Sequence, residues 1–381
     1  MGNKSITFFS YEFPPLLCGG SSFAKGLAEG LSQAGFKITV IAPDNEGAKS
    51  YDAKSLFKVI RFPFSKNTFL NYIIGLVCAA PSLIKHRDSL VFATDILSQR
   101  IVSFILPFLH KRLLILAHGS EIFVNFNEKS FLKRWLYTRI YFHALHIIAN
   151  SNYTKSLLLK QGIDSKRITV VYPAIDQNRF SQNGNPSRIR SLFQLEGKKV
   201  ILTVGTLSER KGQDAVISAL PLVLREIPEL RYLIVGSGRF GRQLKKLTTE
   251  LGLNDHVIFA NGVSSEEIID YYDAADIFVL PNRVVGNFVE GFGIVFLEAA
   301  SRGRPSIGSD NGGVREAVIH GETGYLIDPL NRAEMAQVIT KLLKDRELAA
   351  RLGKQAKTRA LGSFNWGVSC NRLGELLGQI G

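Results

Sequence analysis

The sequence is poor in the residues that build disulfide scaffolds and metal clusters. It has three cysteines in 381 residues, and they lie far apart as Cys18, Cys78 and Cys370. This spacing forms neither a disulfide framework nor a zinc pattern, so a reducing compartment fits best. Apolar residues make up 45% of the chain and charged residues 21%, which is ordinary globular composition and argues against disorder.

No segment reads as a membrane span or a secretion signal. The most apolar stretch, Phe69–Ile84, is shorter than a bilayer-spanning helix and contains Asn71 and Pro81. It is interpreted as a buried or interfacial helix. The first residues lead into no signal-peptide core, and the myristoylation pattern would need Ser or Thr one position after Ser5. We therefore expect a cytoplasmic protein.

Acidic residues are scarce in the first half of the chain. Residues 1–190 hold 24 Lys and Arg but only 11 Asp and Glu, whereas residues 191–381 hold 23 and 22. This asymmetry indicates contact with something anionic, such as a membrane surface, a phosphorylated substrate or a nucleic acid. A well-solvated basic surface explains the charge equally well. Because no nucleic-acid-binding motif accompanies the charge, no nucleic-acid partner is expected.

Short apolar runs alternate with longer helical patterns, such as Ser21–Ala34 and Lys129–Ala144, through most of the sequence. This alternation is typical of parallel sheets that are covered on both faces. The strands expected in the first half are Ile6–Phe9, Lys37–Ile41, Val59–Phe62, Leu90–Ala93, Leu113–Ala117 and Ile147–Ala149. Those expected in the second half are Val200–Val204, Arg231–Val235, Val257–Phe259, Ile277–Val279, Pro305–Gly308 and Gly324–Leu326.

The length favours two α/β domains, because one hydrophobic core seldom serves a chain of this size. The strand and helix patterns both end near Tyr172–Asn185, where proline and glycine interrupt the chain. We predict an N-terminal Rossmann-like domain over residues 1–176 and a second Rossmann-like domain over residues 177–363. A C-terminal helix, 364–381, would complete the first. Two such doubly wound domains would face a central cleft, with ligands at the carboxyl ends of the strands.

A glycine motif, Cys18-Gly19-Gly20-Ser21, follows the first strand and begins a helix. Glycines let the backbone approach a ligand, and a helix N-terminus offers N–H groups and a positive dipole to a phosphate. An ordinary turn with Ser21 or Ser22 as N-cap explains the same residues. By itself the motif is only a candidate phosphate loop.

A basic loop, from Gly205 to Gly212, follows the Val200–Val204 strand and leads into a helix. Arg210 and Lys211 would lie at the carboxyl end of a strand, where a diphosphate leaving group needs cationic partners. A solvated basic loop is the alternative. The position at a strand end favours the binding role.

A G-x-G-x-x-G pattern, Gly236-Ser237-Gly238-Arg239-Phe240-Gly241, lies between a strand and a helix. This is the setting of the dinucleotide fingerprint. The fingerprint also needs an acidic residue after the next strand, where this chain has Ala260-Asn261-Gly262. A nicotinamide dehydrogenase is therefore disfavoured, while a glycine loop beside some other nucleotide is expected.

The most informative motif runs from Val289 to Ala299 and places Glu290 and Glu298 on either side of a Gly291-Phe292-Gly293-Ile294 loop. Burying Glu298 is costly unless its carboxylate receives hydrogen bonds, which ribose or sugar hydroxyls would supply. N–H groups of the loop would meet phosphates. A dipole-stabilised Glu and a satisfied core Glu are the structural alternative.

His118 follows the Leu113–Ala117 strand, in the sequence His118-Gly119-Ser120-Glu121. A His at a strand end could donate to a sugar hydroxyl or to a developing oxygen charge. A lone His is more often structural. The residue is a candidate only in combination with the others.

Together these residues resemble the retaining GT-B glycosyltransferases of family 4, the glycosyl transferases group 1. The likeness covers most of the chain and is strongest from Val200 to Leu326. It rests on the E-x7-E motif (Glu290 and Glu298), the V-G-x-G loop Val235–Gly238, and the segments Asp276–Pro281 and Gly308–Ala317. The stretch Asn282–Glu298 looks most like the phosphatidylinositol mannosyltransferase branch.

The resemblance implies that the domain 1–176 binds the acceptor and the domain 177–363 binds the nucleotide sugar. It also implies a role for each candidate residue. Gly19 and Gly20 would approach the donor diphosphate, and Lys211 would neutralise its charge. Glu290 would contact hydroxyls of the transferred sugar, and Glu298 would hold the nucleotide ribose.

The resemblance also implies what surrounds the sugar and the base. His118 would lie near C6 of the sugar, while Ser237, Gly238 and Val263 would border the base. The family often has Gly-Arg-Leu where this chain has Gly205-Thr206-Leu207, so the usual phosphate-binding Arg is missing. Arg210, one helical turn on, is the candidate substitute.

The family mechanism implies retention of anomeric configuration by front-face attack through an oxocarbenium-like ion pair. The leaving diphosphate would help to deprotonate the acceptor, and Lys211, Arg210 and the loop N–H groups would stabilise its charge. The chain contains no Asp-x-Asp, which agrees with a metal-independent enzyme that needs no cofactor.

The expected reaction is transfer of a hexose, of mannose or glucose type, from a GDP- or UDP-linked sugar to a lipid-linked or glycan acceptor in envelope or polysaccharide biosynthesis. Lys66, Lys85 and Arg87 flank the apolar Phe69–Ile84, which indicates a peripheral enzyme on the inner face of an anionic membrane. A soluble enzyme with a core helix at this position is the alternative. Rival functions are a sugar-nucleotide epimerase, a phosphorylase or a non-catalytic nucleotide-sugar-binding protein.

Overall fold

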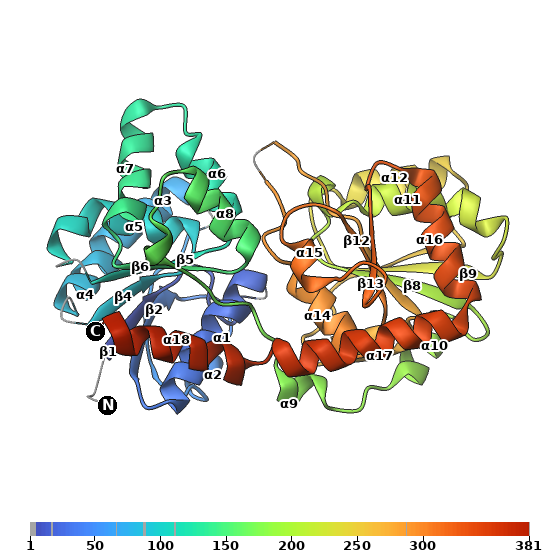
Figure 1. Cartoon of the computed structure of the whole chain (residues 1–381), viewed down its shortest axis with the longest axis horizontal. Coiled ribbons are helices and arrows are strands. Elements are labelled where there is room, and N and C mark those ends of the chain that lie inside the picture. Colours follow the sequence, from blue (N-terminus) through green and yellow to red (C-terminus); the bar gives the residue numbers. More distant parts are fainter. Residues whose placement is uncertain are drawn as a thin grey trace. The chain divides into compact units, whose positions relative to one another are not determined.

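The computed structural model describes residues 5–16, 18–65, 67–86, 89–109, 112–286 and 288–380. The chain divides into two compact units, which Figure 1 shows in sequence colours. Unit 1 comprises Met1–Ala174 and Trp366–Gly381, and unit 2 comprises Ile175–Asn365. The chain therefore leaves unit 1 once and returns to it with its last helix.

Unit 1 is built on seven parallel strands in the order β3-β2-β1-β4-β5-β6-β7. They are β1 (Ser5–Phe9), β2 (Lys37–Pro43), β3 (Lys58–Phe62), β4 (Leu90–Ala93), β5 (Leu113–Ala117), β6 (His146–Ala149) and β7 (Ile168–Val170). Successive strand residues such as Phe8 and Phe9 belong to different core clusters, because their side chains point to opposite faces of the sheet. Two covered faces explain why the strands read as continuous apolar runs.

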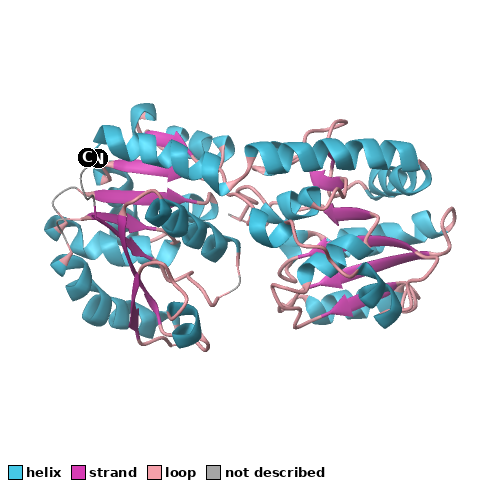
Figure 2. Ribbon diagram, turned by 90° about the horizontal axis from the view of Figure 1, so that it is seen from below, coloured by secondary structure: helices cyan, strands magenta, loops and turns pink. Residues whose placement is uncertain are grey.

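Helices cover both faces of this sheet (Figure 2). They are α1 (Gly19–Gln33), α2 (Ala48–Asp52), α3 (Thr68–Ile74), η1 (Gly75–Ala79), α4 (Ala80–Lys85), α5 (Ile96–Ile105), η2 (Leu106–Phe108), α6 (Ser120–Phe126), α7 (Phe131–His143), α8 (Asn152–Lys160), η3 (Ser165–Arg167) and α18 (Trp366–Ile380). Helices α4, α5, α7 and α8 pack on one face, and α1 and α18 on the other. Trp366 and Cys370 of α18 lie against Gly26 and Gly30 of α1, where any larger side chain would collide with them.

The apolar stretch Phe69–Ile84 is helical in three consecutive segments, because a π-helical turn, η1, separates α3 from α4. Its inner side chains join the core, while Phe69 and Val77 are 73% and 66% exposed. Of the basic residues expected to flank it, Lys66 and Arg87 lie outside the described residues, and Lys85 is exposed. Within the part of the chain that the structure describes, no helix is long and apolar enough to cross a membrane.

Unit 2 is built on six parallel strands in the order β10-β9-β8-β11-β12-β13. They are β8 (Lys199–Val204), β9 (Leu230–Val235), β10 (Val257–Ala260), β11 (Ile277–Leu280), β12 (Ser306–Ser309) and β13 (Gly324–Ile327). The helices are α9 (Gln177–Phe180), α10 (Pro186–Leu192), η4 (Glu209–Lys211), α11 (Gln213–Leu224), α12 (Gly241–Glu250), α13 (Ile268–Ala274), α14 (Ile294–Ser301), α15 (Val314–Ala317), α16 (Arg332–Lys344) and α17 (Arg346–Ser363). The order reverses at β8, and open parallel sheets bind ligands at the carboxyl ends of the strands beside such a reversal, here β8 and β11.

The predicted fold, two doubly wound parallel sheets, is confirmed. The sequence reading missed one strand, β7, because its three residues are too few to show a pattern. It also placed the start of the first helix two residues late. Cys18 is the N-cap, and its Sγ accepts the N–H of Ser21 at 3.3 Å, so neither Ser21 nor Ser22 caps the helix.

Candidate active site

The carboxylate of Glu290 is the centre of a cluster in unit 2. Its Oε2 accepts hydrogen bonds from Nζ of Lys211 at 2.6 Å, Nη1 of Arg210 at 2.8 Å and Nδ2 of Asn282 at 2.7 Å. All three donors reach the same oxygen. No described residue bonds to Oε1, which leaves that oxygen available to a hydroxyl group of a ligand.

The charges in this cluster control the ionisation of Glu290. Burial alone would raise the pKa of its carboxyl, but the charges of Lys211 and Arg210 outweigh burial and lower the pKa to about 2. Glu290 is therefore ionised at neutral pH. Two cations face one carboxylate, so the cluster keeps one net positive charge, which suits an anionic ligand.

The two cations are placed by the short helix η4 and by Gly212, which adopts a φ of +72°. A side chain at Gly212 would collide with the carbonyl oxygen of Pro281, so only glycine lets the two loops approach this closely. The N–H of Arg283 donates to the carbonyl of Arg210 at 2.8 Å. These contacts fix the loop after β8 to the loop after β11.

The backbone of Glu290 is held by the Asp310-Asn311-Gly312-Gly313 loop after β12. The N–H of Gly313 donates to the carbonyl of Glu290 at 2.9 Å. Side chains at Gly312 or Gly313 would collide with the backbone of Glu290 and Gly291. In the sequence, only the family resemblance pointed to this loop. In the structure, the loop contacts the backbone of Glu290 and helps to position it.

Two asparagines extend the cluster and escaped the sequence reading as site residues. Asn282 is fully buried, and its backbone carbonyl accepts from Nδ2 of Asn311 at 2.8 Å. The Oδ1 atoms of both residues are buried and have no hydrogen-bond partner in the described chain. Their place directly after β11 and β12 is the signal that could have identified them.

The G-x-G-x-x-G pattern mainly lets two loops pack together. A side chain at Gly236 would strike the carbonyl of Gly205, and one at Gly238 would strike that of Leu207. The N–H of Leu207 donates to the carbonyl of Ser237 at 2.9 Å. Ser237 and Gly238 are exposed at the end of β9, and they remain available to a ligand.

Val263, the remaining base-side candidate, and Thr206, where the usual phosphate-binding Arg is missing, differ in exposure. Val263 is half-buried and follows β10, the strand that pairs with β9. Thr206 is exposed, and its carbonyl accepts from Nε2 of Gln213 at 3.1 Å. Thr206 brings no charge, so Arg210 and Lys211 are the cations that this loop contributes to the Glu290 cluster.

Gly293 begins helix α14 with a φ of +89°. The N–H groups of Gly293 and Ile294 have no acceptor among the described residues, as expected at a helix N-terminus. Gly291 is buried, and the ring of Phe292 packs against Phe364 with centroids 5.5 Å apart. The ring of Phe292 is therefore not available to a ligand.

Glu298 lies in the second turn of α14, and its Oε2 accepts from the hydroxyl of Tyr272 at 2.7 Å. Burial raises the pKa of its carboxyl, although the Tyr272 bond opposes the shift. No described residue pairs Glu298 with a cation. Its partly satisfied carboxylate is suited to accept hydroxyl groups.

In unit 1, His118 follows β5, and its Nε2 bonds to the carbonyl of Thr94 at 2.8 Å. A carbonyl only accepts, so Nε2 carries the proton and Nδ1 of the neutral ring is an acceptor. The sequence reading expected His118 to donate. With Nε2 bonded to Thr94, Nδ1 could donate only if the ring carried a second proton, as an imidazolium.

Gly19 and Gly20 form the first turn of α1, where an acidic neighbour escaped the sequence reading. A side chain at Gly20 would collide with Oε2 of Glu12, which also accepts from Sγ of Cys18 at 3.5 Å. Burial, followed by the charge of Glu12, raises the pKa of the Cys18 thiol to about 12. Cys18 is therefore a protonated helix cap and not a nucleophile.

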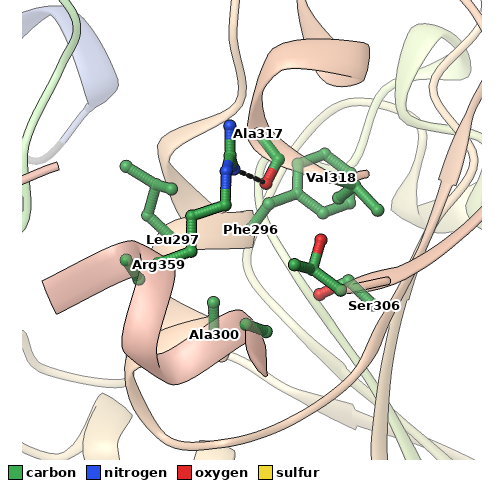
Figure 3. A pocket seen from close by; sticks show the side chains of 10 residues that line it. Phe296, Leu297, Ala300, Ser306, Ala317, Val318 and Arg359 are labelled. Carbon is green, nitrogen blue, oxygen red and sulfur yellow. Dashed lines mark hydrogen bonds between the residues drawn. The ribbon is translucent and has the colours of Figure 1, made fainter. Parts of the chain in front are cut away.

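A small pocket in unit 2 lies apart from these residues (Figure 3). It is lined by α14, β12 and α17, with Phe296, Ser306 and Ala300 around it, and contains none of the candidate site residues. Arg359 reaches its rim and donates to the carbonyls of Ala317 and Glu316 at 3.0 and 2.6 Å. We assign it no ligand.

Two family models match the chain. The model described as Glycosyltransferase Family 4 matches residues 18–179, and the model described as Glycosyl transferases group 1 matches residues 186–359. With the two parallel sheets, these matches define a glycosyltransferase of the GT-B class. Within that class the chain belongs to family 4.

Relatives and solved structures agree with this assignment. The chain is 28% identical, over 96% of both chains, to GDP-mannose-dependent alpha-(1-6)-phosphatidylinositol monomannoside mannosyltransferase of Mycolicibacterium smegmatis. It is 32% identical to mannosylfructose-phosphate synthase of Agrobacterium fabrum, over 58% of this chain and 50% of that one. The expected likeness to family 4 and to phosphatidylinositol mannosyltransferases is thus confirmed.

Two solved structures share the fold over nearly the whole chain. Sucrose-phosphate synthase from Thermosynechococcus elongatus has a TM-score of 0.83 at 21% identity, over 99% of both chains. Anabaena Alr3699/HepE in complex with UDP and glucose has a TM-score of 0.80 at 20% identity, over 99% of this chain and 100% of that one.

Proposed function

We propose that this glycosyltransferase transfers a hexose from a nucleoside-diphosphate sugar, with retention of configuration, to a lipid-linked or glycan acceptor. The observation that carries the proposal is the Glu290 cluster, whose three donors occupy Oε2 and leave Oε1 open. A carboxylate with one free oxygen binds a sugar hydroxyl, and two neighbouring cations attract a diphosphate.

The donor is proposed to be a GDP- or UDP-linked sugar of mannose or glucose type. Support comes from the names of similar proteins, since the relative over 96% of the chain is GDP-mannose-dependent and a structural neighbour holds UDP and glucose. In unit 2, Ser237, Gly238 and Val263 would border the base, and Glu298 would accept the ribose hydroxyls. Gly205 would lie beside the phosphates.

In the proposed reaction, the bond from C1 of the sugar to the β-phosphate oxygen breaks with its electrons on that oxygen. The acceptor hydroxyl attacks C1 from the same face, and its proton passes to the departing phosphate. Lys211 and Arg210 stabilise the charge that grows on the leaving group, and the N–H groups of Gly293 and Ile294 add to this. The cations take the role that a divalent ion serves elsewhere.

Unit 1 is proposed to receive the acceptor, with Gly19, Gly20 and His118 directed to the reacting groups. Its segment Phe69–Ile84 exposes Phe69, Leu70, Ile73 and Val77, and Lys85 follows them. Exposed apolar groups beside basic residues favour a peripheral location on the inner face of an anionic membrane. A lipid-linked acceptor would be met there.

A thermal-shift panel of GDP, UDP, ADP and their sugars tests donor binding. One nucleoside diphosphate should raise the melting temperature. At a ligand concentration of 100 Kd, binding should add about 2.7 kcal/mol to the apparent free energy of unfolding. Lys211→Ala should weaken the response, whereas Lys246→Ala, which removes an exposed Lys paired with Glu250 on α12, should not. If no nucleotide or sugar nucleotide shifts the protein, the proposed function is wrong.

Two further measurements separate the rivals. Incubation with the preferred donor alone would yield an epimerised sugar nucleotide if the protein were an epimerase, and the proposal predicts none. Flotation with anionic and neutral liposomes tests the location, since binding should need anionic lipid and weaken with salt. Failure to float at low salt both with anionic vesicles and with native membranes would exclude the peripheral location.

A further inference from the structure

Exposed aromatic side chains are concentrated in one part of unit 1. Among the described residues, seven of the eight exposed Phe and Trp side chains lie between residues 64 and 142, and the eighth is Phe288. Monomeric surfaces seldom gather large apolar groups in this way unless they bind something. An interaction surface within this segment would account for their exposure.

The first turn of α7 carries the most exposed of these side chains. Phe131, Leu132 and Trp135 are 74%, 69% and 52% exposed. Ser130 caps the helix, and in Figure 1 the turn between α6 and the start of α7 projects from the edge of unit 1. We refer to Phe131, Leu132 and Trp135 as the α7 tip.

The rest of α7 is firmly attached, so the α7 tip is a fixed projection. Tyr137, Ile140 and Tyr141 are buried. The hydroxyl of Tyr141 donates to Oε1 of Gln99 on α5 at 2.7 Å, and the guanidinium of Arg100 lies 4.4 Å from the ring centre of Tyr137. A helix anchored this way keeps its exposed end ordered without a partner.

Cations predominate around the α7 tip, although the carboxylate of Glu128 accepts the N–H of Ser130 at 3.3 Å. Lys133 and Arg134 lie within it and are exposed, and Lys129 directly precedes the cap. The guanidinium of Arg134 lies 5.9 Å from the ring centre of Phe131, and that of Arg139 lies 4.9 Å from that of Trp135. Helix α7 contains no Asp or Glu.

We propose that the α7 tip inserts into the headgroup region of an anionic lipid surface, with Lys129, Lys133 and Arg134 facing the lipid phosphates. Trp favours that interface because its ring is apolar and its N–H is polar, and Lys and Arg extend their charges from an apolar surface to the headgroups. A protein partner for so basic a surface would have to be acidic. The wide aromatic exposure fits a fluid lipid layer better. The proposal rests on the peripheral location proposed above and names the surface responsible.

The two tryptophans of the sequence allow a direct test. Trp366 is half-buried against α1, so Trp366→Phe keeps an aromatic ring there and leaves Trp135 as the single fluorophore. Vesicles of phosphatidylcholine and phosphatidylglycerol should shift its emission to the blue, and lipids brominated near the headgroup should quench it. Unchanged emission from protein that floats with those vesicles would overturn the proposal.

Flotation of variants gives a second test. Phe131→Ser with Leu132→Ser should lower the vesicle-bound fraction at least tenfold. The matched control, Leu192→Ser with Leu330→Ser, removes two exposed leucines of unit 2 (63% and 73% exposed) and should float like the wild type. Nucleotide thermal shifts should be unchanged in both, which shows that the variants fold and bind the donor.

The outcomes separate this proposal from the proposed function. If the wild type floats and the α7 variant floats equally, the α7 tip is not the contact, while the peripheral location stands. If the wild type floats with native membranes but never with protein-free anionic vesicles, its partner is a protein and the lipid proposal is wrong. If the wild type binds neither, the peripheral location fails too, whereas the donor-binding result is unaffected.

Discussion

Nδ2 of Asn282 donates to Oε2 of Glu290 at 2.7 Å and so closes the loop that joins β11 to α14. Within that loop, Val285 and Phe288 exchange backbone hydrogen bonds at 3.1 and 3.0 Å. The carboxylate is thereby held from its own loop by Asn282 and from the loop after β8 by Lys211 and Arg210. Its orientation is fixed before any ligand arrives, which is the condition for electrostatic catalysis.

We predict that Glu290→Ala and Lys211→Ala each lower kcat by about 10²–10³, the usual effect of removing one electrostatic contact to a developing charge. Each substitution should leave the fold intact, since both side chains lie at a loop cluster and not in the core. Lys246→Ala is the control for loss of a Lys–Glu pair in the same unit. Folded variants with near-wild-type turnover would disprove the assignment.

Arg210→Ala should lower kcat by the same factor as Lys211→Ala or by a smaller one. Arg210 is 27% exposed against 13% for Lys211, so water screens its charge more effectively. The measurement is kcat with the preferred donor at saturation. An unchanged rate would mean that another cation serves the diphosphate in place of the Arg absent at Thr206.

Asn282→Ala should lower kcat about tenfold or more, because Glu290 would lose a hydrogen bond of roughly 1.5–3 kcal/mol to its charged form. The pKa of Glu290, about 2 in the wild type, should also rise in this variant, because a hydrogen bond to a carboxylate favours its charged form. Because the folded pKa lies below the usual 4.5, the ionised carboxylate adds stability above pH 4.5, and this is lost as pH falls toward 2.

A pH profile therefore distinguishes positioning from simple packing at Asn282. In the wild type, Glu290 should not produce an acid limb above about pH 4. In Asn282→Ala, and more so in Lys211→Ala, the acid limb should move to higher pH. Asn282→Gln serves as the conservative comparison, because it retains an amide donor. Identical acid limbs in all variants would show that Asn282 does not act through Glu290.

The sequence alone was sufficient to predict the fold, but it predicted only part of the Glu290 cluster. Strand patterns identify β8 and β11, and the spacing of Glu290 from Gly293 identifies a loop before a helix. The two cationic partners of Glu290, Lys211 and Arg210, are 79 and 80 residues away in the chain, so only the folded sheet brings them together. The basic loop after β8 and the family resemblance predicted Lys211 as a site residue. Nothing in the local sequence distinguishes Asn282 from an ordinary turn residue.

Exposure was the other quantity that periodicity could not supply. The pattern Lys129–Ala144 reads as one amphipathic helix, yet its first turn projects, and only Tyr137, Ile140 and Tyr141 of the helix are buried. Phe131 and Tyr141 are both aromatic, and only the packing of α5 against α7 determines which of them meets solvent. The segment Phe69–Ile84 likewise was correctly expected to be helical, but its π-helical turn left no sequence signal.

Glu298→Gln should stabilise the ligand-free protein and weaken donor binding. Burial raises the pKa of this carboxyl, so the ionised form destabilises the native state at neutral pH. Glutamine keeps an acceptor for the Tyr272 hydroxyl without the charge. The melting temperature should rise at pH 7–8, the gain should shrink as pH falls and the carboxyl is protonated, and nucleotide Kd should increase. A lower melting temperature at pH 8 would contradict the argument.

Transfer should survive EDTA. The Glu290 cluster carries one net positive charge and lies near the unpaired N–H groups that begin α14, so the chain itself supplies groups that stabilise a leaving diphosphate. Among the described residues, no group of three or more His, Cys, Asp or Glu side chains is placed to hold a metal ion. Initial rates should be equal in excess EDTA, in buffer alone and in added Mg²⁺ or Mn²⁺. A dialysed sample that loses activity in EDTA and regains it with Mg²⁺ or Mn²⁺ would show that the cations do not suffice.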